Sequence, residues 1–206
     1  MQISLYQQEQ YDAISLIRQH LDTLSRKQIE TLREMSYDYL MFRQQVDVFI
    51  DTYFSSVCTH NCFQNHLSIC CTREGIITFF ADAVINALVS SPDEQSCLLS
   101  VLKTPDNRLK CIYLSSNGCL WRIKPIVCQM FLCDDVKHKV FQKYPLAQAE
   151  WDSLKMQEKS FTWPDRPVLF DSLEDIFIAA GYTSSLMHLH LSPGLLRIKK
   201  LSGLYS

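Results

Sequence analysis

The chain contains 206 residues, of which 47% are hydrophobic, so it can bury a sizeable core, and this argues against disorder. Its 20 lysines and arginines nearly balance 22 aspartates and glutamates, and the net charge of -2 provides no basic field that would attract nucleic acid or anionic lipid. No apolar run reaches the length of a membrane span and no signal-peptide pattern opens the sequence, so we expect a cytoplasmic protein with neither nucleic acid nor membrane as a partner.

Apolar periodicity predicts helices throughout the first half of the chain. Residues at spacings of three and four form one stripe of a helix that ends near 23–25. Ser25 then opens a capping box, and the pattern that follows predicts one long helix over 25–55. A third helix is expected over 75–89, and a capping serine followed by proline and two acids predicts a fourth over 91–103.

The pattern changes after Lys110. Two short strand-like runs, 111–114 and 119–122, flank the turn signal Asn117-Gly118 and predict a small β-hairpin. Pro125 is then placed to open another helix, which we expect to run through Lys139.

The C-terminal part contains a proline-punctuated loop at Pro164 and Pro167. Ser172 is expected to start a helix that Gly181 closes, whereas the secondary structure of the stretch 187–201 is ambiguous. The sequence therefore predicts an all-α or α-dominated single domain with a Cys-rich metal centre and a small β-hairpin. We expect it to have three parts: an N-terminal helical segment over 1–57, a Cys-cluster metal-binding region over 58–140, and a C-terminal helical extension over 141–206 that packs on it.

Nine cysteines is a high number for a chain of this length, and in a reducing cytosol thiols persist as metal ligands, catalytic groups or buried side chains. The first group comprises Cys58, Cys62, Cys70 and Cys71. On a helix that runs through residue 62, the first two share a face. Adjacent side chains diverge, so we expect only one of Cys70 and Cys71 to reach a given metal. Four soft thiolates in a short segment suit zinc or iron-sulfur chemistry.

A second group comprises Cys111, Cys119, Cys128 and Cys133. A regular helix would turn the last two of these well apart. Their joint ligation of a metal therefore requires the helix that Pro125 opens to end or distort before Cys133.

This arrangement resembles a family of zinc- or iron-chelating proteins that carry a C-x2-C-x2-C-C cluster. The downstream part of the family pattern is matched by four segments: Cys111-Ile-Tyr-Leu114, Cys119-Leu-Trp121, Lys124-Pro125-Ile-Val-Cys128 and Cys133. The upstream spacings exceed those of the family, and Lys124 replaces its usual arginine. The resemblance covers residues 58–133 and implies a bound metal. Because the family includes proteins similar to flagellin lysine methylases, it also implies an alternative, a metal-dependent enzyme that modifies a protein side chain.

The spacing of the cysteines leaves two metals open. Structural zinc usually sits on C-x2-C pairs, and the sequence contains none, which favours an iron-sulfur cluster. No cysteine precedes a proline as in bacterial ferredoxins, so the spacing matches no standard cluster motif and zinc stays as the alternative. In either case we expect a structural or redox role, with a protein as the partner or substrate and no catalytic residue identified. A third possibility is a set of redox-sensing thiols without metal.

The remaining candidates are weaker as ligands. His60 and His66 lie among the first cysteines and could replace a thiolate, although loop histidines are more often on the surface. His188 and His190 would share one face of a strand, as a polar face or a minor metal or proton-transfer site. Cys97 lies outside both groups and is expected to be a small core side chain.

Overall fold

The computed structural model describes residues 3–72, 76–106, 108–163 and 167–187, and 68% of these residues are helical, which confirms the α-dominated prediction. His188, His190 and nearly all of the ambiguous stretch 187–201 lie outside the described residues. The described helices are α1 (Leu5–Thr23), α2 (Arg26–Met35), α3 (Tyr37–Ser55), the π-helix η1 (Ser56–Phe63), α4 (Phe80–Val89), α5 (Pro92–Lys103), α6 (Ile126–Gln129), α7 (Asp134–Lys143), α8 (Pro145–Thr162) and α9 (Leu169–Ala179).

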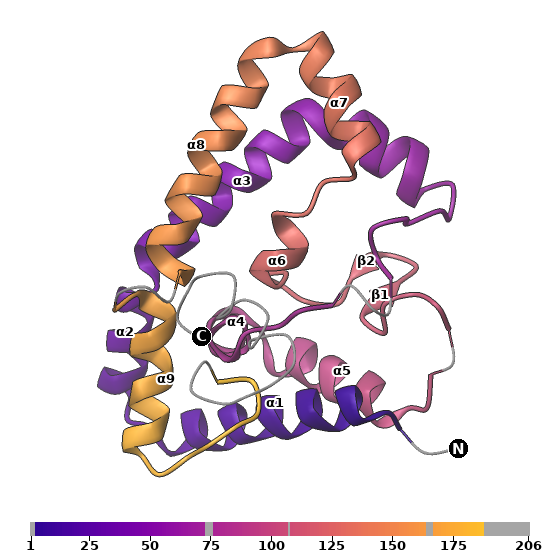
Figure 1. The fold of residues 1–206 in the computed structure, drawn as a ribbon. Coiled ribbons are helices and arrows are strands. Elements are labelled where there is room, and N and C mark those ends of the chain that lie inside the picture. Colours follow the sequence, from indigo (N-terminus) through magenta and orange to yellow (C-terminus); the bar gives the residue numbers. More distant parts are fainter. Residues whose placement is uncertain (1–2, 73–75, 107, 164–166, 188–206) are drawn as a thin grey trace, which may run out of the picture.

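The long helices form a frame around α4 (Figure 1). Helices α3 and α8 pack along each other as one long side, and α7 bridges their far ends. Helices α1 and α5 pack together as the base, while α4 contacts α1, α2 and α9. The short elements α6, β1 and β2 lie inside this frame, on the side where α3 continues into η1.

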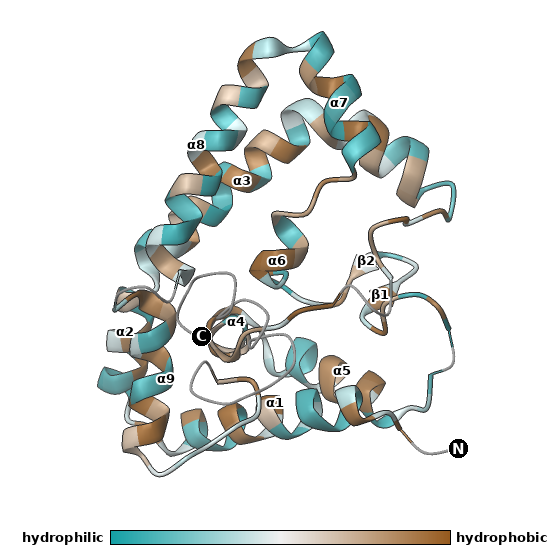
Figure 2. Cartoon of the chain, in the orientation of Figure 1, coloured by the Kyte–Doolittle hydropathy of each residue, from teal (hydrophilic) through white to brown (hydrophobic). Residues whose placement is uncertain are grey.

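Apolar side chains on the facing sides of the helices build one core. Helix α4 is buried nearly all round, which is the pattern of a central helix rather than a surface helix. Helices α1, α3 and α8 instead alternate hydrophobic and hydrophilic sides (Figure 2). Aromatic rings join α3 to α8: Phe42 stacks on Phe161 at 5.5 Å between ring centroids, and Phe49 stacks on Trp151 at 5.3 Å.

Three serine side chains start helices as capping boxes. The hydroxyl oxygens of Ser4, Ser25 and Ser91 each accept a hydrogen bond from the backbone N–H three residues later, at 3.2 to 3.4 Å. Such a cap contributes about 1 kcal/mol to helix stability, because it satisfies an N–H that has no partner within the helix. The boxes confirm the helix starts predicted at Ser25 and Ser91.

The long helix predicted over 25–55 was wrong, because the structure divides it at Ser36. The Ser36 hydroxyl donates a hydrogen bond to the Leu32 carbonyl at 2.9 Å, and the Ser36 N–H is shared between the carbonyls of Leu32 and Arg33. Serine back-bonding of this kind bends helices, and here it separates α2 from α3.

Two further helix boundaries differ from the prediction. Helix α4 begins at Phe80 rather than near residue 75, because the Asp82 carboxylate accepts the Phe79 N–H at 3.1 Å and caps the helix there. The helix predicted from Pro125 through Lys139 is interrupted, since α6 ends at Gln129 and α7 begins at Asp134. Two acids in the first turn of α7 favour a new helix start at that point.

The predicted hairpin is confirmed, with shorter strands than expected. Strands β1 (Leu114–Ser115) and β2 (Gly118–Cys119) pair antiparallel, with Leu114 opposite Cys119. Gly118 has φ +112°, a value that side chains rarely tolerate, so glycine is the natural residue at this position.

The C-terminal helices differ most from the sequence reading. Helix α8 was not predicted, although Pro145 stands at its first position, and α9 begins at Leu169, ahead of the expected start at Ser172. Gly181, at φ +86°, follows the end of α9 as predicted. Within the part of the chain that the structure describes, no helix combines the length and apolarity needed to cross a bilayer.

Candidate functional site

Helix α3 passes directly into η1, which carries Cys58 and Cys62. The helix therefore does run through residue 62, but in π form, with backbone bonds between residues five apart such as Gln64 N–H to Thr59 O at 2.9 Å. The wider winding still keeps residues four apart on one side, and both cysteines are half-buried. π-Helical segments are rare and frequently mark functional sites.

The turn after η1 folds back over Cys62. The Leu67 N–H donates to the Cys62 carbonyl at 2.9 Å, and the Ile69 N–H donates to the Cys62 sulfur at 3.4 Å. His66 and Ser68 have φ values of +60° and +39°, in the left-handed region that non-glycine residues rarely adopt. Strain of this kind persists only where the surrounding structure imposes it, and it clusters at functional sites.

Backbone hydrogen bonds join the two cysteine groups. The Cys111 N–H donates to the Cys71 carbonyl at 3.1 Å, and Thr72 pairs with Lys110 in an isolated antiparallel bridge. The Lys110 ammonium donates to the Leu67 carbonyl at 2.5 Å and so ties the same turn to the hairpin segment. Two groups that are far apart in the sequence therefore meet in space.

The hairpin brings Cys111 near Cys119. Cys119 lies opposite Leu114, and the Leu114 N–H donates to the Cys111 carbonyl at 3.0 Å. The second strand therefore returns toward the start of the first, next to the segment that carries Cys71.

Buried polar side chains anchor the segment that carries Cys128. The Ile126 N–H donates to Asp82 Oδ1 at 3.0 Å, and Arg43 Nη2 donates to the Lys124 carbonyl at 2.7 Å. These contacts hold the start of α6 against α4 and α3.

Cys133 lies just before α7, with extended backbone angles of φ -60° and ψ 136°. Helix α6 has already ended at Gln129. The geometric condition for joint ligation, a helix that ends before Cys133, is therefore met.

Four thiols influence one another on the η1 side of the site. The pKa of Cys58 is raised to about 11, mainly by burial and then by three neighbouring thiols, those of Cys70, Cys133 and Cys62. Burial also raises the pKa of Cys133, with further contributions from Cys70 and Cys62. Each thiolate would repel the charge of another, so these thiols are harder to ionise together than singly.

A second set of thiols interacts on the hairpin side. The pKa of Cys128 is raised to about 12, mainly by burial and then by Cys111, Asp82, Cys119 and Cys70. Burial raises the pKa of Cys111 to about 11, to which Cys119 contributes. The pKa of Cys71 is lowered, chiefly by the hydrogen bond that it accepts from the Cys70 thiol. That bond also raises the pKa of Cys70, the donor.

The thiols are gathered but not closed around an ion. All nine cysteines lie among the described residues, and none forms a disulfide. Across the described ranges, no three histidine, cysteine, aspartate or glutamate side chains form a group that could hold a metal ion. The raised pKa values favour protonated thiols at neutral pH, so a metal would have to displace protons as it binds.

Lys124 adds a positive charge near the thiols, a role that its place in the cysteine pattern did not predict. Its ammonium lowers the pKa of Cys58 and of Cys119 against the larger opposing effect of burial. A lysine beside a proline in the middle of a cysteine pattern is the signal that could have pointed to a charge within the site.

Neither His60 nor His66, the two candidate histidines that the structure describes, is part of a metal-holding group. His60 is exposed, and its Nδ1 lies 3.0 Å from Gln64 Oε1. His66 is also exposed and lines a surface hollow.

The prediction that Cys97 is a core side chain was wrong, because it is exposed. The buried face of α5 is formed by Leu98 and Leu102 instead, and Cys97 lies to one side of that stripe.

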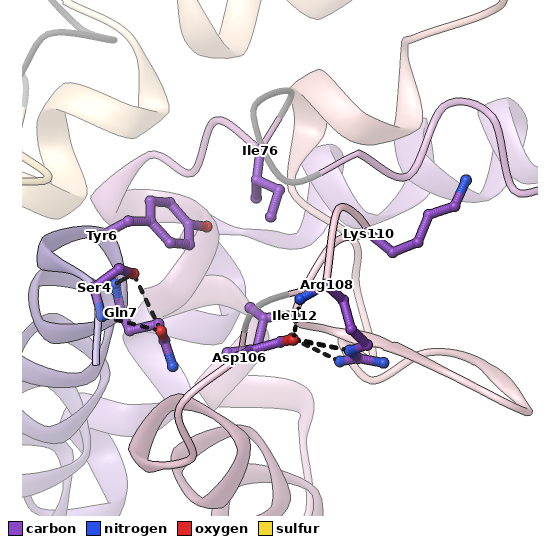
Figure 3. Close-up of a pocket in the computed structure, with 8 residues that line it drawn as sticks. All are labelled: Ser4, Tyr6, Gln7, Ile76, Asp106, Arg108, Lys110 and Ile112. Atoms are coloured by element: carbon purple, nitrogen blue, oxygen red, sulfur yellow. Dashed lines mark hydrogen bonds and ion pairs between the residues drawn. The ribbon is translucent and has the colours of Figure 1, made fainter. Parts of the chain in front are cut away.

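Two hollows lie near the cysteine groups. The larger, of about 650 Å³, lies between the end of η1 and the hairpin, and it is lined by Phe63, Gln64, His66, Ser68, Lys110, Leu114, Ser115 and Ser116. The smaller, of about 260 Å³, is shown in Figure 3. There the charges of Asp106 and Arg108 pair with each other at 2.8 Å, and Ser4 and Gln7 are joined in their capping box. The larger hollow, whose lining includes none of the cysteines, is therefore the better candidate for a ligand.

Comparisons of the chain with known protein families, with curated proteins and with solved structures found no match.

Proposed function

We propose that this chain is a metal-binding protein whose cysteine thiolates hold an iron-sulfur cluster or zinc in a structural or redox role. The observation that supports this is the backbone contact between the two cysteine groups, in which the Cys111 N–H donates to the Cys71 carbonyl, beside the turn that folds over Cys62. The ninth cysteine, Cys97, is exposed on α5, outside both groups. Soft thiolates are the ligands that zinc and iron-sulfur clusters prefer.

The local structure of this region also supports a bound metal. The eight cysteines lie in two segments, 56–72 and 108–133. These segments contain only η1, two strands of two residues each and the short helix α6. A bound metal supplies folding free energy to segments that cannot bury enough apolar surface by themselves. The proposed site would therefore stabilise the part of the chain that needs it most.

The choice of metal still follows the spacing of the cysteines. The sequence lacks C-x2-C pairs, which favours an iron-sulfur cluster, and zinc is the alternative.

Metal and sulfide analysis of the full chain, purified without oxygen, tests the proposal. We expect a stoichiometric metal content, with broad brown absorbance and acid-labile sulfide if the metal is iron, and a colourless zinc-loaded protein otherwise. The variant Cys97→Ser should keep the metal, whereas Cys119→Ser should lose a substantial part of it. Protein that contains neither metal at stoichiometric level, or thiols that form reversible disulfides instead, would refute the proposal.

The larger hollow supports a second candidate, a metal-dependent enzyme that acts on a protein side chain. The hollow lies against the turn that folds over Cys62, and Lys110 and three serines line it. Such an enzyme needs an open coordination position at the metal. Cyanide added to the cobalt-loaded protein should shift the visible spectrum if the position is open. An unchanged spectrum would exclude this second candidate and leave the first.

A further inference from the structure

We propose that the larger hollow, between the end of η1 and the hairpin, is a binding site for a small phosphate ester. Its volume of about 650 Å³ falls within the range of small-molecule sites. None of the residues that line it is a cysteine, so binding at this site would involve none of the proposed metal ligands.

The charge of the surrounding segments favours an anionic ligand. Segments 56–72 and 108–133 contain four lysines and arginines and no aspartate or glutamate, although the whole chain has a net charge of -2. Two of these cations pair with acids outside the segments, at 2.8 and 3.3 Å. Lys110 lines the hollow and forms no ion pair with any described residue. A local excess of positive charge raises the concentration of anions near the site.

Lys110 is held in a way that leaves a donor for a ligand. Its ammonium donates to the carbonyls of Leu67 and Ser68, at 2.5 and 3.2 Å. An ammonium has three N–H donors, so the third has no partner among the described residues. The two carbonyls are neutral and leave the positive charge uncompensated. An anion in the hollow can therefore accept both a hydrogen bond and the charge of Lys110.

Two serine hydroxyls add further donors. Ser68 is only 6% exposed and lines the hollow, and its hydroxyl makes no hydrogen bond within the described ranges. Ser116 also lines the hollow, is exposed, and has a hydroxyl with no partner in the described part of the chain. Ser115 differs, because its hydroxyl already donates to the Gly118 carbonyl at 2.8 Å and accepts the Asn117 N–H at 3.2 Å. Two of the three serines can therefore donate to a ligand oxygen.

The residue after η1 supplies an amide donor. Gln64 lines the hollow, and its Oε1 lies 3.0 Å from His60 Nδ1. That contact occupies the amide oxygen and leaves the amide nitrogen without a partner among the described residues. The amide nitrogen can therefore donate to a ligand as well.

The number of donors fits a phosphate better than a carboxylate. An ammonium, two hydroxyls and an amide make four donor groups around one hollow. A phosphate monoester has three strong acceptor oxygens, whereas a carboxylate has two. The additional acceptor oxygen lets a phosphate use more of these donors at once.

Apolar lining residues favour an ester over inorganic phosphate. Phe63, at the end of η1, and Leu114, in β1, both line the hollow and are half-buried. The organic part of an ester can cover such side chains and remove their apolar surface from water. An aromatic ester gains a ring contact with Phe63 in addition.

Backbone contacts hold the donors in place before a ligand arrives. The turn that carries Ser68 is tied to η1 by the Leu67 N–H and to the hairpin segment by Lys110, and the Cys71 N–H donates to the Ser68 carbonyl at 3.0 Å. The pairing of β1 with β2 fixes the connection that carries Ser116. Donors that are already ordered lose less conformational entropy on binding.

Isothermal titration calorimetry of the full chain, as purified, tests the site. We expect saturable binding of phenyl phosphate that is about threefold to tenfold tighter than binding of inorganic phosphate, because of the ring contact with Phe63. Phenyl phosphate should also bind more tightly than benzoate, and added sodium chloride should weaken its binding. Absence of saturable binding, or benzoate that binds as tightly as phenyl phosphate, would overturn the proposal.

Two variants test whether the ligand occupies the hollow. Lys110→Gln should weaken phenyl phosphate binding at least about tenfold, because it removes the charge that attracts the phosphate. Ser116→Asp should also weaken it, because the new carboxylate repels the ligand. Ser153→Asp adds the same charge at an exposed position of α8, outside the lining of the hollow, and should bind as the unmodified chain does.

The helical circular dichroism of each variant shows whether it has kept its fold. If Lys110→Gln releases the turn and loses this signal, Ser116→Asp decides the outcome, since Ser116 is exposed and its side chain contributes no hydrogen bond within the described residues. Unchanged affinity in a folded Ser116→Asp variant, or an equal loss in Ser153→Asp, would overturn the assignment of the ligand to this hollow.

Discussion

The aromatic helical core and the cysteine-bearing region of the same chain are organised by different forces. In the core, Tyr39, Phe42 and Phe170 are fully buried, and rings from α3, α8 and α9 pack directly on one another. In the cysteine-bearing region, residues 56–72 and 108–133, the thiols are mostly half-buried. Packed rings dominate the first region, whereas the second combines half-buried thiols with a smaller buried apolar set, Ile112, Tyr113, Trp121, Ile126 and Leu132.

Both regions also expose some apolar side chains, such as Val48 on α3, which is 66% exposed. Ile69 is 60% exposed and Phe131 is 54% exposed, and both lie in the cysteine-bearing region. A small, loop-rich region of this kind usually needs cross-links or a metal in addition to its packing. The eight thiols therefore lie in the region whose stability would gain most from a bound metal.

Of the predicted changes, removal of the proposed metal should alter the difference in stability between the two regions most. Structural zinc contributes roughly 10 kcal/mol or more to the folding of small metal-binding domains, so chelation should abolish most amide-exchange protection in the cysteine-bearing region. Helices α3 and α8 should keep their protection, because their aromatic contacts do not involve the thiols. Exchange measured by mass spectrometry before and after chelation checks this, and equal loss in both regions would contradict the division.

Truncation of an aromatic core side chain should produce the opposite pattern. Phe42 is fully buried and stacks on Phe161, so Phe42→Ala should lower the free energy of unfolding by about 3 to 5 kcal/mol. Urea denaturation measures the loss. Val48→Ala is the matched control on the same helix, since Val48 is 66% exposed and its truncation should cost less than about 0.5 kcal/mol. A small effect at Phe42 would show that the core is not the main source of stability.

A buried carboxylate connects the two regions. Asp82 on α4 accepts one hydrogen bond from the Phe79 N–H and another from the Ile126 N–H, next to the segment that carries Cys128. Burial raises its pKa from 3.8 to about 7. The titratable or charged groups that face it from other elements are Tyr39, Arg43, Cys128 and Glu158.

The pKa of Asp82 predicts how stability depends on pH. Because the folded pKa lies above the unfolded value, the native state binds more protons between these values, and the free energy of unfolding falls as pH rises toward 7 and slightly beyond. Asp82→Asn should remove this fall, which amounts to on the order of 2 kcal/mol between about pH 5 and pH 8.

Denaturation curves at both pH values, compared with the unmodified chain, check this prediction. Asp51→Asn, which changes an exposed carboxylate on α3, serves as the control and should follow the unmodified chain. An unchanged pH dependence in Asp82→Asn would assign the effect to another group.

The local features of this fold could be predicted from the sequence. The capping serines, the hairpin around Asn117-Gly118 and the helix closed before Gly181 depend on residues within a few positions of one another. The demand that a helix end before Cys133 followed from the spacing of two cysteines alone, and the structure meets it. Short-range patterns therefore located the hairpin, whereas the single helix expected from Pro125 through Lys139 is divided into α6 and α7.

The features that depend on contacts between distant segments could not be predicted. Helix α4 starts where Asp82 caps it, and the same side chain anchors α6 forty-four residues away. The π winding of η1 and the exposure of Cys97 likewise depend on how α3 and α5 pack on the rest of the chain. A single sequence gives no direct information on such contacts.

The smallest expected effect concerns α2, which contributes only Leu32 as a fully buried residue. With so little burial, α2 should depend on its capping box, and Ser25→Ala should lower the free energy of unfolding by about 1 kcal/mol. Ser25→Thr retains a hydroxyl that can accept the Gln28 N–H, so it should lose much less. Urea denaturation of both variants measures the difference. Equal losses would mean that packing of α2 on α4, rather than its cap, holds this helix, and the core would then extend further than its aromatic contacts indicate.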